Sequence, residues 1–225
     1  MFEYKIQIIL FLFPLYFIFL FIFPKIVPSF FYILTIYLTI YHVEFAPTTN
    51  KGESTMKIKF CGGVQSVTGS CHLLTIGSKK VLLDCGQFQG GKTLEALNYE
   101  DFGFRPSEID YVILSHAHID HCGRIPLLVK SGFSGTIFCT SSTFDLVQIM
   151  LRDSAYIHER EAEWKTRKNE RAGKKAAEPL YTIQDAEASF AYFEPILYGQ
   201  TKQLCDEIKI KFRDAGHILG SAITE

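Results

Sequence analysis

The chain has 225 residues, of which 48% are hydrophobic, with a net charge of −1 and a pI near 6.7. The length allows one or two domains, and the balanced charge excludes the strongly basic composition with which some proteins bind nucleic acid through bulk charge. Because the six cysteines form no CxxC pair and no pattern of a small disulfide-rich scaffold, we expect reduced thiols in a cytoplasmic protein.

The first 55 residues differ in composition from the rest of the chain. Two apolar runs, residues 8–23 and 26–41, are each roughly 16 residues long, which is close to the lower limit for a helix that crosses a bilayer. One interpretation is a membrane anchor through residues 8–41, in which Pro14 is tolerated. A signal peptide is disfavoured, because the apolar region is too long and no cleavage site follows it.

An alternative interpretation is that residues 1–55 are an untranslated leader. This segment holds ten of the twenty Phe residues and no Gly or Ala before Ala46, a composition typical of AT-rich DNA. Gly52-Glu53 can be encoded by a purine-rich ribosome-binding sequence just before Met56. We therefore hypothesise that translation starts at Met56, and an intact mass that includes earlier residues would contradict this. The predicted organisation is a hydrophobic segment, 1–55, followed by a domain, 56–225.

From Met56 onward, short strands alternate with helices. Runs rich in apolar and β-branched residues predict the strands, and stretches bounded by capping residues and glycines predict the helices. Strands are expected at residues 57–60, 71–76, 80–83, 111–114, 136–139 and 208–212. Helices are expected at 92–98, 125–130, 143–171 (as one helix or two) and 185–192.

The middle of the chain, from about residue 159 to 175, is strongly charged. A group of glutamates is followed by a group of basic residues that would suit a phosphate backbone. A solvated helix face is the simpler interpretation. The basic residues are Lys165, Arg167, Lys168, Arg171, Lys174 and Lys175.

A cluster of metal-ligand residues directly follows the strand expected at 111–114. Residues 116–121 read His-Ala-His-Ile-Asp-His, and imidazole nitrogens and carboxylate oxygens are good ligands for zinc-like ions. Side chains alternate along extended backbone, so His116 and His118 point the same way and can reach one ion. Asp120 has the same parity and, with its neighbour His121, can serve a second ion.

Residues 116–121 resemble the signature of the metallo-β-lactamase fold. Residues 81–86, Val-Leu-Leu-Asp-Cys-Gly, resemble the strand-end aspartate upstream of that signature, and residues 214–222 resemble the next histidine motif. The Gly-His-Ile-Leu-Gly-Ser form of the last motif is similar to that of the β-CASP branch, which holds RNA-processing nucleases. The resemblance covers about residues 56–225 and implies an α/β (α+β) fold, namely the N-terminal part of an αββα sandwich.

The resemblance also implies a function. The expected protein is a metal-dependent hydrolase, a phosphodiesterase or ribonuclease in which two zinc ions hold a hydroxide that attacks phosphorus. Asp84 is expected to orient the histidine loop through hydrogen bonds without touching a metal. Asp120 is expected also to orient the hydroxide. The implied ligands are His116, His118 and His217 at the first zinc ion, and Asp120 and His121 at the second.

Several alternatives stay open from the sequence. The substrate is expected to be RNA, with single-stranded DNA as an alternative, and a membrane is a partner only if residues 1–55 are translated. The same fold also hydrolyses other esters, thioesters and lactams, and a non-catalytic nucleic-acid-binding or membrane-associated remnant is a further alternative.

The family continues beyond the equivalent of Glu225 with a bridging aspartate and a β-CASP domain, so we expect an N-terminal fragment that is inactive alone. Its expected location is the cytoplasm, or a membrane if residues 8–41 anchor it.

Overall fold

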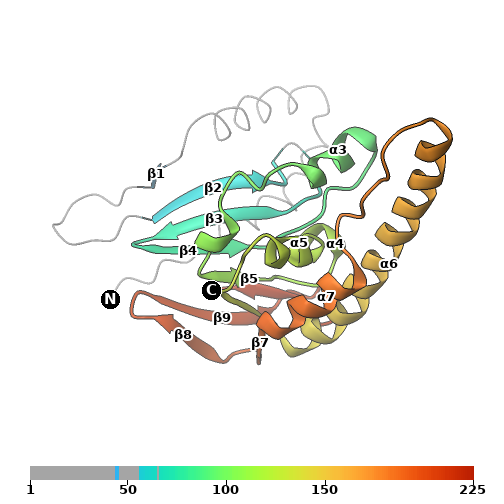
Figure 1. Cartoon of the computed structure of the whole chain (residues 1–225). Coiled ribbons are helices and arrows are strands. Elements are labelled where there is room, and N and C mark those ends of the chain that lie inside the picture. The colour runs from blue at the N-terminus through green and yellow to red at the C-terminus, as the bar shows by residue number, and fades with distance from the viewer. Residues whose placement is uncertain (1–43, 46–55, 65) are drawn as a thin grey trace, which may run out of the picture.

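The computed structural model describes residues 44–45, 56–64 and 66–225 (Figure 1). The two interpretations of residues 1–55, an anchor or an untranslated leader, fall outside the described residues, apart from the two-residue strand β1 (Glu44–Phe45). Within the described part of the chain, no helix combines the length and the apolar composition needed to cross a membrane.

A seven-stranded sheet forms the centre of the domain (Figure 1). In spatial order its strands are β1, β2 (Met56–Gly62), β3 (Cys71–Ile76), β4 (Lys79–Leu83), β5 (Tyr111–Ile113), β6 (Thr136–Thr140) and β7 (Phe193–Ile196). Strands β1 to β4 pair antiparallel, whereas β4 to β7 pair parallel. Parallel neighbours need long crossover connections, and most of the helices lie in these connections. The carboxyl ends of β4 and β5 therefore meet at one edge of the sheet.

A second, three-stranded sheet packs against the first. It consists of β8 (Thr201–Cys205), β9 (Ile208–Asp214) and β10 (Ala222–Thr224), all antiparallel, with β9 in the middle. Ile210 and Phe212 of β9 are buried in one core with Val81 and Phe138 of the large sheet. The alternation of β9 thus places its apolar residues between the two sheets and its lysines on the outside.

Helices cover the other face of the large sheet. They are α5 (Ile125–Lys130), α6 (Ser141–Arg171) and α7 (Ile183–Ser189). Leu128 and Leu151 of these helices share a core with Leu82, Val112 and Ile137 of the sheet. Because neighbouring residues of β4, β5 and β6 point into opposite cores, these strands are buried on both faces, which explains their continuous apolar sequences.

The expected strands and helices from Met56 onward are confirmed, with small shifts at their ends. Residues 92–98 form a short helix, α3 (Lys92–Ala96), that continues into a 3₁₀ turn, η1 (Leu97–Tyr99). Residues 143–171 belong to one helix, α6, which begins earlier than expected because the side chain of Thr140 caps it. The helix expected at 185–192 is α7 followed by the 3₁₀ turn η3 (Phe190–Tyr192). The sequence analysis did not predict α4 (Ile119–Cys122), β7, β8 or the 3₁₀ turn η2 (Pro106–Glu108).

Candidate metal centre

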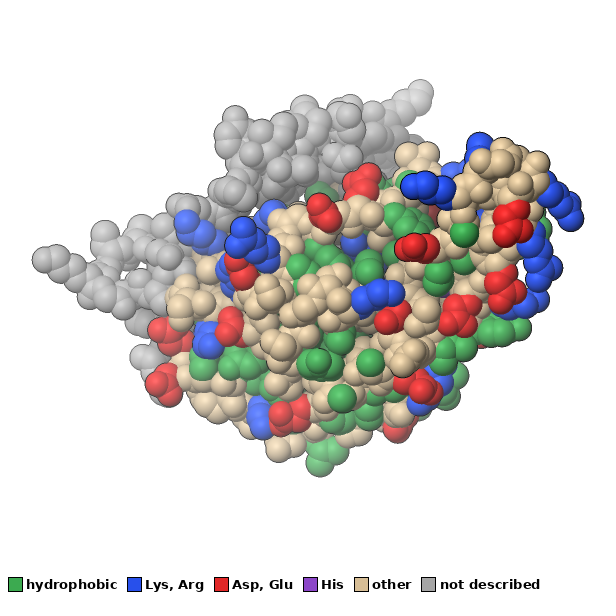
Figure 2. Space-filling view, viewed as in Figure 1, with side chains coloured by type: hydrophobic (Ala, Val, Ile, Leu, Met, Phe, Trp, Pro, Cys, Tyr) green, Lys and Arg blue, Asp and Glu red, His purple; other side chains and the backbone are tan. Residues whose placement is uncertain are grey.

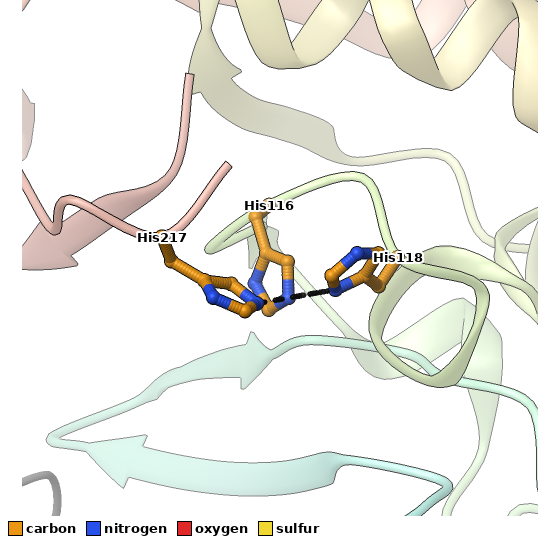
Figure 3. Close-up of side chains that lie close together, drawn as sticks. All are labelled: His116, His118 and His217. Atoms are coloured by element: carbon orange, nitrogen blue, oxygen red, sulfur yellow. Dashed lines mark hydrogen bonds between the residues drawn. The ribbon is translucent and has the colours of Figure 1, made fainter. Parts of the chain in front are cut away.

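Three histidines from two distant segments meet at the edge of the large sheet (Figure 3). His116 and His118 lie in the extended stretch that follows β5, and His217 lies in the loop between β9 and β10. His116 Nε2 lies 3.0 Å from His118 Nδ1, which in turn lies 3.3 Å from His217 Nε2. The ligand atoms of all three residues lie within 4.8 Å of one another.

This arrangement fits a divalent ion. Zinc binds imidazole nitrogen at about 2.0–2.1 Å with tetrahedral geometry, so two nitrogen ligands of one ion lie about 3.3 Å apart. The nitrogen separations of 3.0 and 3.3 Å in the cluster are close to that value. The exposure of the cluster rises from buried His116 to exposed His217, so the site is open on one side to solvent and to a substrate.

Ser115 fixes the orientation of His116. The Ser115 hydroxyl lies 3.0 Å from Asp84 Oδ2 and 2.9 Å from His116 Nδ1. A carboxylate only accepts hydrogen bonds, so the single hydroxyl proton goes to Asp84, and the oxygen accepts from His116 Nδ1. This assignment leaves Nε2 of His116 unprotonated toward the cluster. Burial, together with the nearby histidines, lowers the pKa of His116 to about 4, which keeps this imidazole neutral at pH 7.

Asp120 and His121 lie beside the cluster rather than in it. The sequence analysis placed Asp120 in the same extended stretch as His116 and His118, but the extended backbone ends at His118, the N-cap of α4. Alternation therefore does not set the direction of Asp120. Instead, the helical turn places Asp120 Oδ2 3.6 Å from His121 Nε2. These two atoms are close enough to contact one ion together.

Asp84 connects the ends of β4 and β5. Its Oδ1 accepts a 2.8 Å bond from the Ser115 backbone amide, and its Oδ2 lies 2.7 Å from His121 Nδ1 and 3.2 Å from the Ser70 hydroxyl. The backbone of Asp84 has a φ of 57°. Aspartate tolerates this left-handed conformation better than most residues, which lets the carboxylate turn back under the histidine loop.

The charges of Asp84 and His121 stabilise each other. Burial raises the pKa of the Asp84 carboxyl, but hydrogen bonds from His121 and Ser115 outweigh burial and hold the pKa below its ordinary value. Burial lowers the pKa of His121, but the hydrogen bond and the charge of Asp84 raise it above its ordinary value. Because Nδ1 of His121 is engaged by Asp84, Nε2 is the nitrogen that faces Asp120.

The loop that carries His217 depends on residues whose role the sequence analysis missed. The Ser221 hydroxyl accepts hydrogen bonds from the backbone amides of His217 and Ile218 at 3.1 and 3.2 Å. The carbonyl of Gly220, which has a φ of 82°, accepts bonds from the hydroxyls of Thr140 and Thr143 at 2.6 and 2.8 Å. The Gly-Ser pair after the histidine was the available signal in the sequence.

A direct link also joins the two segments of the site. The backbone amide of Ala222 in β10 donates a 2.9 Å bond to the carbonyl of Ser115. The start of α6 and the start of β10 therefore both hold the His217 loop against the His116 loop.

Comparison with known proteins relates this chain to a family. Residues 66–137 match the model described as the metallo-beta-lactamase superfamily. Ribonuclease TTHA0252 of Thermus thermophilus is 38% identical over 167 residues, which cover 74% of this chain and 34% of that protein. Transcription termination factor FttA of Methanocaldococcus jannaschii is 33% identical, over 77% of this chain and 25% of that protein. Cleavage and polyadenylation specificity factor 73 of Drosophila melanogaster is 34% identical, over 75% of this chain and 22% of that protein.

The chain thus spans about a third or less of the length of these relatives. The resemblance inferred from the sequence motifs is confirmed, both in the mixed α/β fold and in the relatives. The superfamily implies binding of a divalent metal, and the histidine cluster is available for it. The chain therefore contains a metallo-β-lactamase domain, matched over residues 66–137, and its relatives include a ribonuclease.

Proposed function

We propose that this protein is a zinc-dependent phosphodiesterase that cleaves RNA. The observation that carries the proposal is the convergence of His116, His118 and His217 in a domain related to Ribonuclease TTHA0252. The names of two further relatives, a transcription termination factor and a cleavage and polyadenylation specificity factor, also support a nucleic-acid substrate.

The side chains divide into two ligand groups in this proposal. His116, His118 and His217 hold the first zinc ion, and Asp120 and His121 hold the second. Bound zinc would supply an activated water at neutral pH and would neutralise charge that develops on the phosphate.

Two aspartates have different roles in the proposal. The Asp120 carboxylate, at the start of α4, orients the water that attacks phosphorus. Asp84 contacts no zinc ion, but it holds His121 by its Nδ1 and, through Ser115, holds His116 by its Nδ1. Such outer contacts fix the direction of each ligand nitrogen and raise its basicity.

Zinc binding is tested first on the purified chain. Bound zinc is measured by mass spectrometry after dialysis against zinc and then against buffer without metal. We expect His118→Ala and His217→Ala to lose the zinc of the first site. His158→Gln serves as a matched histidine control, because His158 lies on α6 with Gln87 and Ser154 as its partners. Equal zinc in all four proteins would contradict the ligand assignment.

Substrate class is tested separately, with the zinc-loaded protein. Cleavage of an end-labelled single-stranded RNA that stops with EDTA and in His118→Ala would support the phosphodiesterase proposal, and it would contradict the expectation from the sequence that this chain is inactive alone. A chromogenic β-lactam and a thioester are the comparison substrates. Hydrolysis of either comparison substrate without RNA cleavage would replace the phosphodiesterase proposal by the alternative chemistry of the same fold.

A further inference from the structure

The C-terminal end of α6 and the segment after it form an exposed cationic surface, which we call the α6 tip. Figure 2 shows Lys and Arg side chains gathered along this edge of the molecule. Glu170 is the acidic residue within the tip. The aromatic and basic side chains of the α6 tip are all exposed: Trp164, Lys165, Arg167, Lys168, Arg171, Lys174 and Lys175.

Most of these cations have no carboxylate partner. Lys165 pairs with Glu161 at 3.1 Å, and Arg167 lies 3.9 Å from Glu163. The remaining four cations make no ion pair with any described residue: Lys168, Arg171, Lys174 and Lys175. The helix dipole favours cations in the last turn of a helix, and thus accounts for Lys168 and Arg171. It does not account for Lys174 and Lys175, which lie beyond the end of α6.

The segment beyond α6 is held in place beside the helix. The Lys174 amide donates a 2.9 Å bond to the Asn169 carbonyl, and Asn169 Nδ2 donates a 2.9 Å bond to the Lys175 carbonyl. The Ala177 amide donates a 2.9 Å bond to the Thr166 hydroxyl. These bonds fix the backbone of Lys174 and Lys175, so a polyanion would meet charges that are already arranged.

Trp164 adds an aromatic surface to the cations. Its side chain is 63% exposed, although tryptophan is usually well buried. Lys168 Nζ lies 5.5 Å from the centre of its ring. Lys168 and Arg171 follow Trp164 by four and seven positions, which places all three on one face of α6. An exposed ring flanked by cations is the combination with which proteins hold single-stranded nucleic acid.

Helix α6 runs alongside the candidate metal centre. At its start, Thr140 and Thr143 contact the loop of His217, as described above. Further along, His158 Nε2 lies 2.9 Å from Gln87 Nε2, in the loop that Asp84 begins. Six residues of helix, about 9 Å, separate His158 from Trp164. A strand held at the tip can therefore follow the same helix toward the metal centre, over about 30 Å from Trp164 to Thr143.

We propose that the α6 tip binds single-stranded RNA, with a base stacked on Trp164 and phosphates on the four unpaired cations. The choice of RNA as the polyanion rests on the proposed function. The tip holds the substrate outside the metal centre, so its contribution is to affinity and not to the chemical step.

Binding is measured with the full chain in EDTA, so that cleavage plays no part. The probe is a fluorescein-labelled oligouridylate of about 20 nucleotides, a length that covers one binding site. Trp164 is the only tryptophan of the sequence, so intrinsic tryptophan emission reports on the tip alone. We expect the unlabelled oligouridylate to quench this emission over the same concentrations that raise the anisotropy of the labelled one.

Two charge-matched variants test the location. The tip variant carries Lys168→Gln, Arg171→Gln and Lys174→Gln, which preserve helix propensity. The control variant carries Arg105→Gln, Lys209→Gln and Lys211→Gln, which remove the same charge from other surfaces. We expect the tip variant to bind at least about tenfold more weakly and its logarithmic salt dependence to fall by about 2, because each phosphate contact to a single strand contributes about 0.7. The control should stay within about twofold of the parent.

Three outcomes would overturn the proposal. The first is equal weakening in the tip and control variants, which would mean that general charge carries the binding. The second is unchanged Trp164 emission while the oligouridylate is bound. The third is binding of the tip to phosphatidylserine vesicles in place of RNA. The proposed function fails separately, whatever the RNA affinity, if zinc binding to the chain does not depend on His118 and His217.

Discussion

Asp84 is the residue that connects both ligand groups of the proposed site. Replacing Asp84 by Asn removes the negative charge and retains a side chain that tolerates the left-handed backbone. We expect Asp84→Asn to weaken zinc binding by about 10- to 100-fold, because His121 and Ser115 lose the acceptor that orients them. Zinc titration against a competing chelator measures the effect.

The control for this experiment is Asp206→Asn, on the exposed turn between β8 and β9. An Asp84→Asn protein that binds zinc as tightly as Asp206→Asn would show that the carboxylate does not support the ligands. A loss of folding, seen as a lower unfolding midpoint in both the presence and absence of zinc, is measured in parallel by circular dichroism.

Gly86 allows the loop after β4 to pack directly against α4. A Cβ atom at this position would lie 1.6 Å from the Asp120 carbonyl oxygen. We expect Gly86→Ala to lower the free energy of unfolding by about 3 kcal/mol, because two backbone segments must move apart. The same change at Gly173, where φ is 68°, should cost only about 1 kcal/mol for the left-handed backbone. There an added Cβ atom would have no atom within 4 Å apart from those of the residue itself and its chain neighbours. Urea denaturation of both variants measures the difference, and equal costs would refute it.

At the scale of single residues, the sequence predicted the ligand-type side chains and the supporting Asp84, but not the serines that also support them. The meeting of His116 and His118 followed from alternation along an extended chain. Ser115 was missed because a serine carries no local signal that distinguishes an orienting hydroxyl from a solvated one, and its partner Asp84 is 31 positions away. For Ser221 the signal was local, in the Gly-Ser pair that follows His217.

At the scale of elements, α7 depends on its first turn. The Thr182 hydroxyl accepts a 3.1 Å bond from the Asp185 amide, and Asp185 Oδ2 accepts 2.9 Å bonds from the Thr182 amide and from Lys130 Nζ. We expect Thr182→Ala to lower the free energy of unfolding by about 1 kcal/mol, and Thr182→Ser to restore most of it. Chemical denaturation at pH 7 tests this, and equal stability of the Ala and Ser variants would contradict the capping role.

The same cap predicts a dependence on pH. Burial raises the pKa of Asp185, but bonds from Lys130 and Thr182 outweigh it and hold the pKa below its ordinary value. The stabilisation is therefore present above the pKa of the unfolded chain and is lost as the pH falls through the lower pKa of the folded one. We expect the stability difference between the parent and Asp185→Asn to be full at pH 7 and to disappear in acid. A difference that grows as the pH falls would contradict this sign.

The elements that the sequence analysis missed have identifiable causes. Pro195 made the β7 segment a poor candidate, but β7 is an edge strand, where proline is tolerated. Strand β8, Thr-Lys-Gln-Leu-Cys, is polar and half-exposed, so its pairing with β9 decides its conformation more than its composition does. Helix α4 is only four residues long and lies inside the histidine motif, where backbone bonds from the Asp84 loop fix it: the Cys85 amide bonds to the His121 carbonyl.

At the scale of the whole molecule, the histidine ligands belong to two different sheets. His116 and His118 follow β5 of the large sheet, whereas His217 lies between two strands of the small one. An ion bound by all three histidines would therefore join the sheets. If the proposed zinc site forms only in the folded chain, zinc at about 100 times its dissociation constant should stabilise folding by about 2.7 kcal/mol. Thermal midpoints over a zinc titration measure this stabilisation.

The variant His217→Ala separates this effect from ordinary packing. His217 is exposed, so its removal should change the stability of the zinc-free protein by no more than about 0.5 kcal/mol. The rise of the thermal midpoint with zinc should be lost or strongly reduced in this variant. A full zinc-dependent rise in His217→Ala would show that the ion does not join the sheets.

The separation of the ligands along the chain has a consequence for the order of folding. His118 and His217 are 99 positions apart, whereas His116 and His118 are neighbours in one short loop. Contacts between distant positions form late, because closing a long loop costs entropy before the contact repays it. A chain that has folded only as far as β6 thus offers two imidazoles to the ions around it. The preference for one metal over its competitors arises from geometry and ligand number. In this protein we expect that preference to be acquired late in folding, when β9 and β10 bring the third histidine.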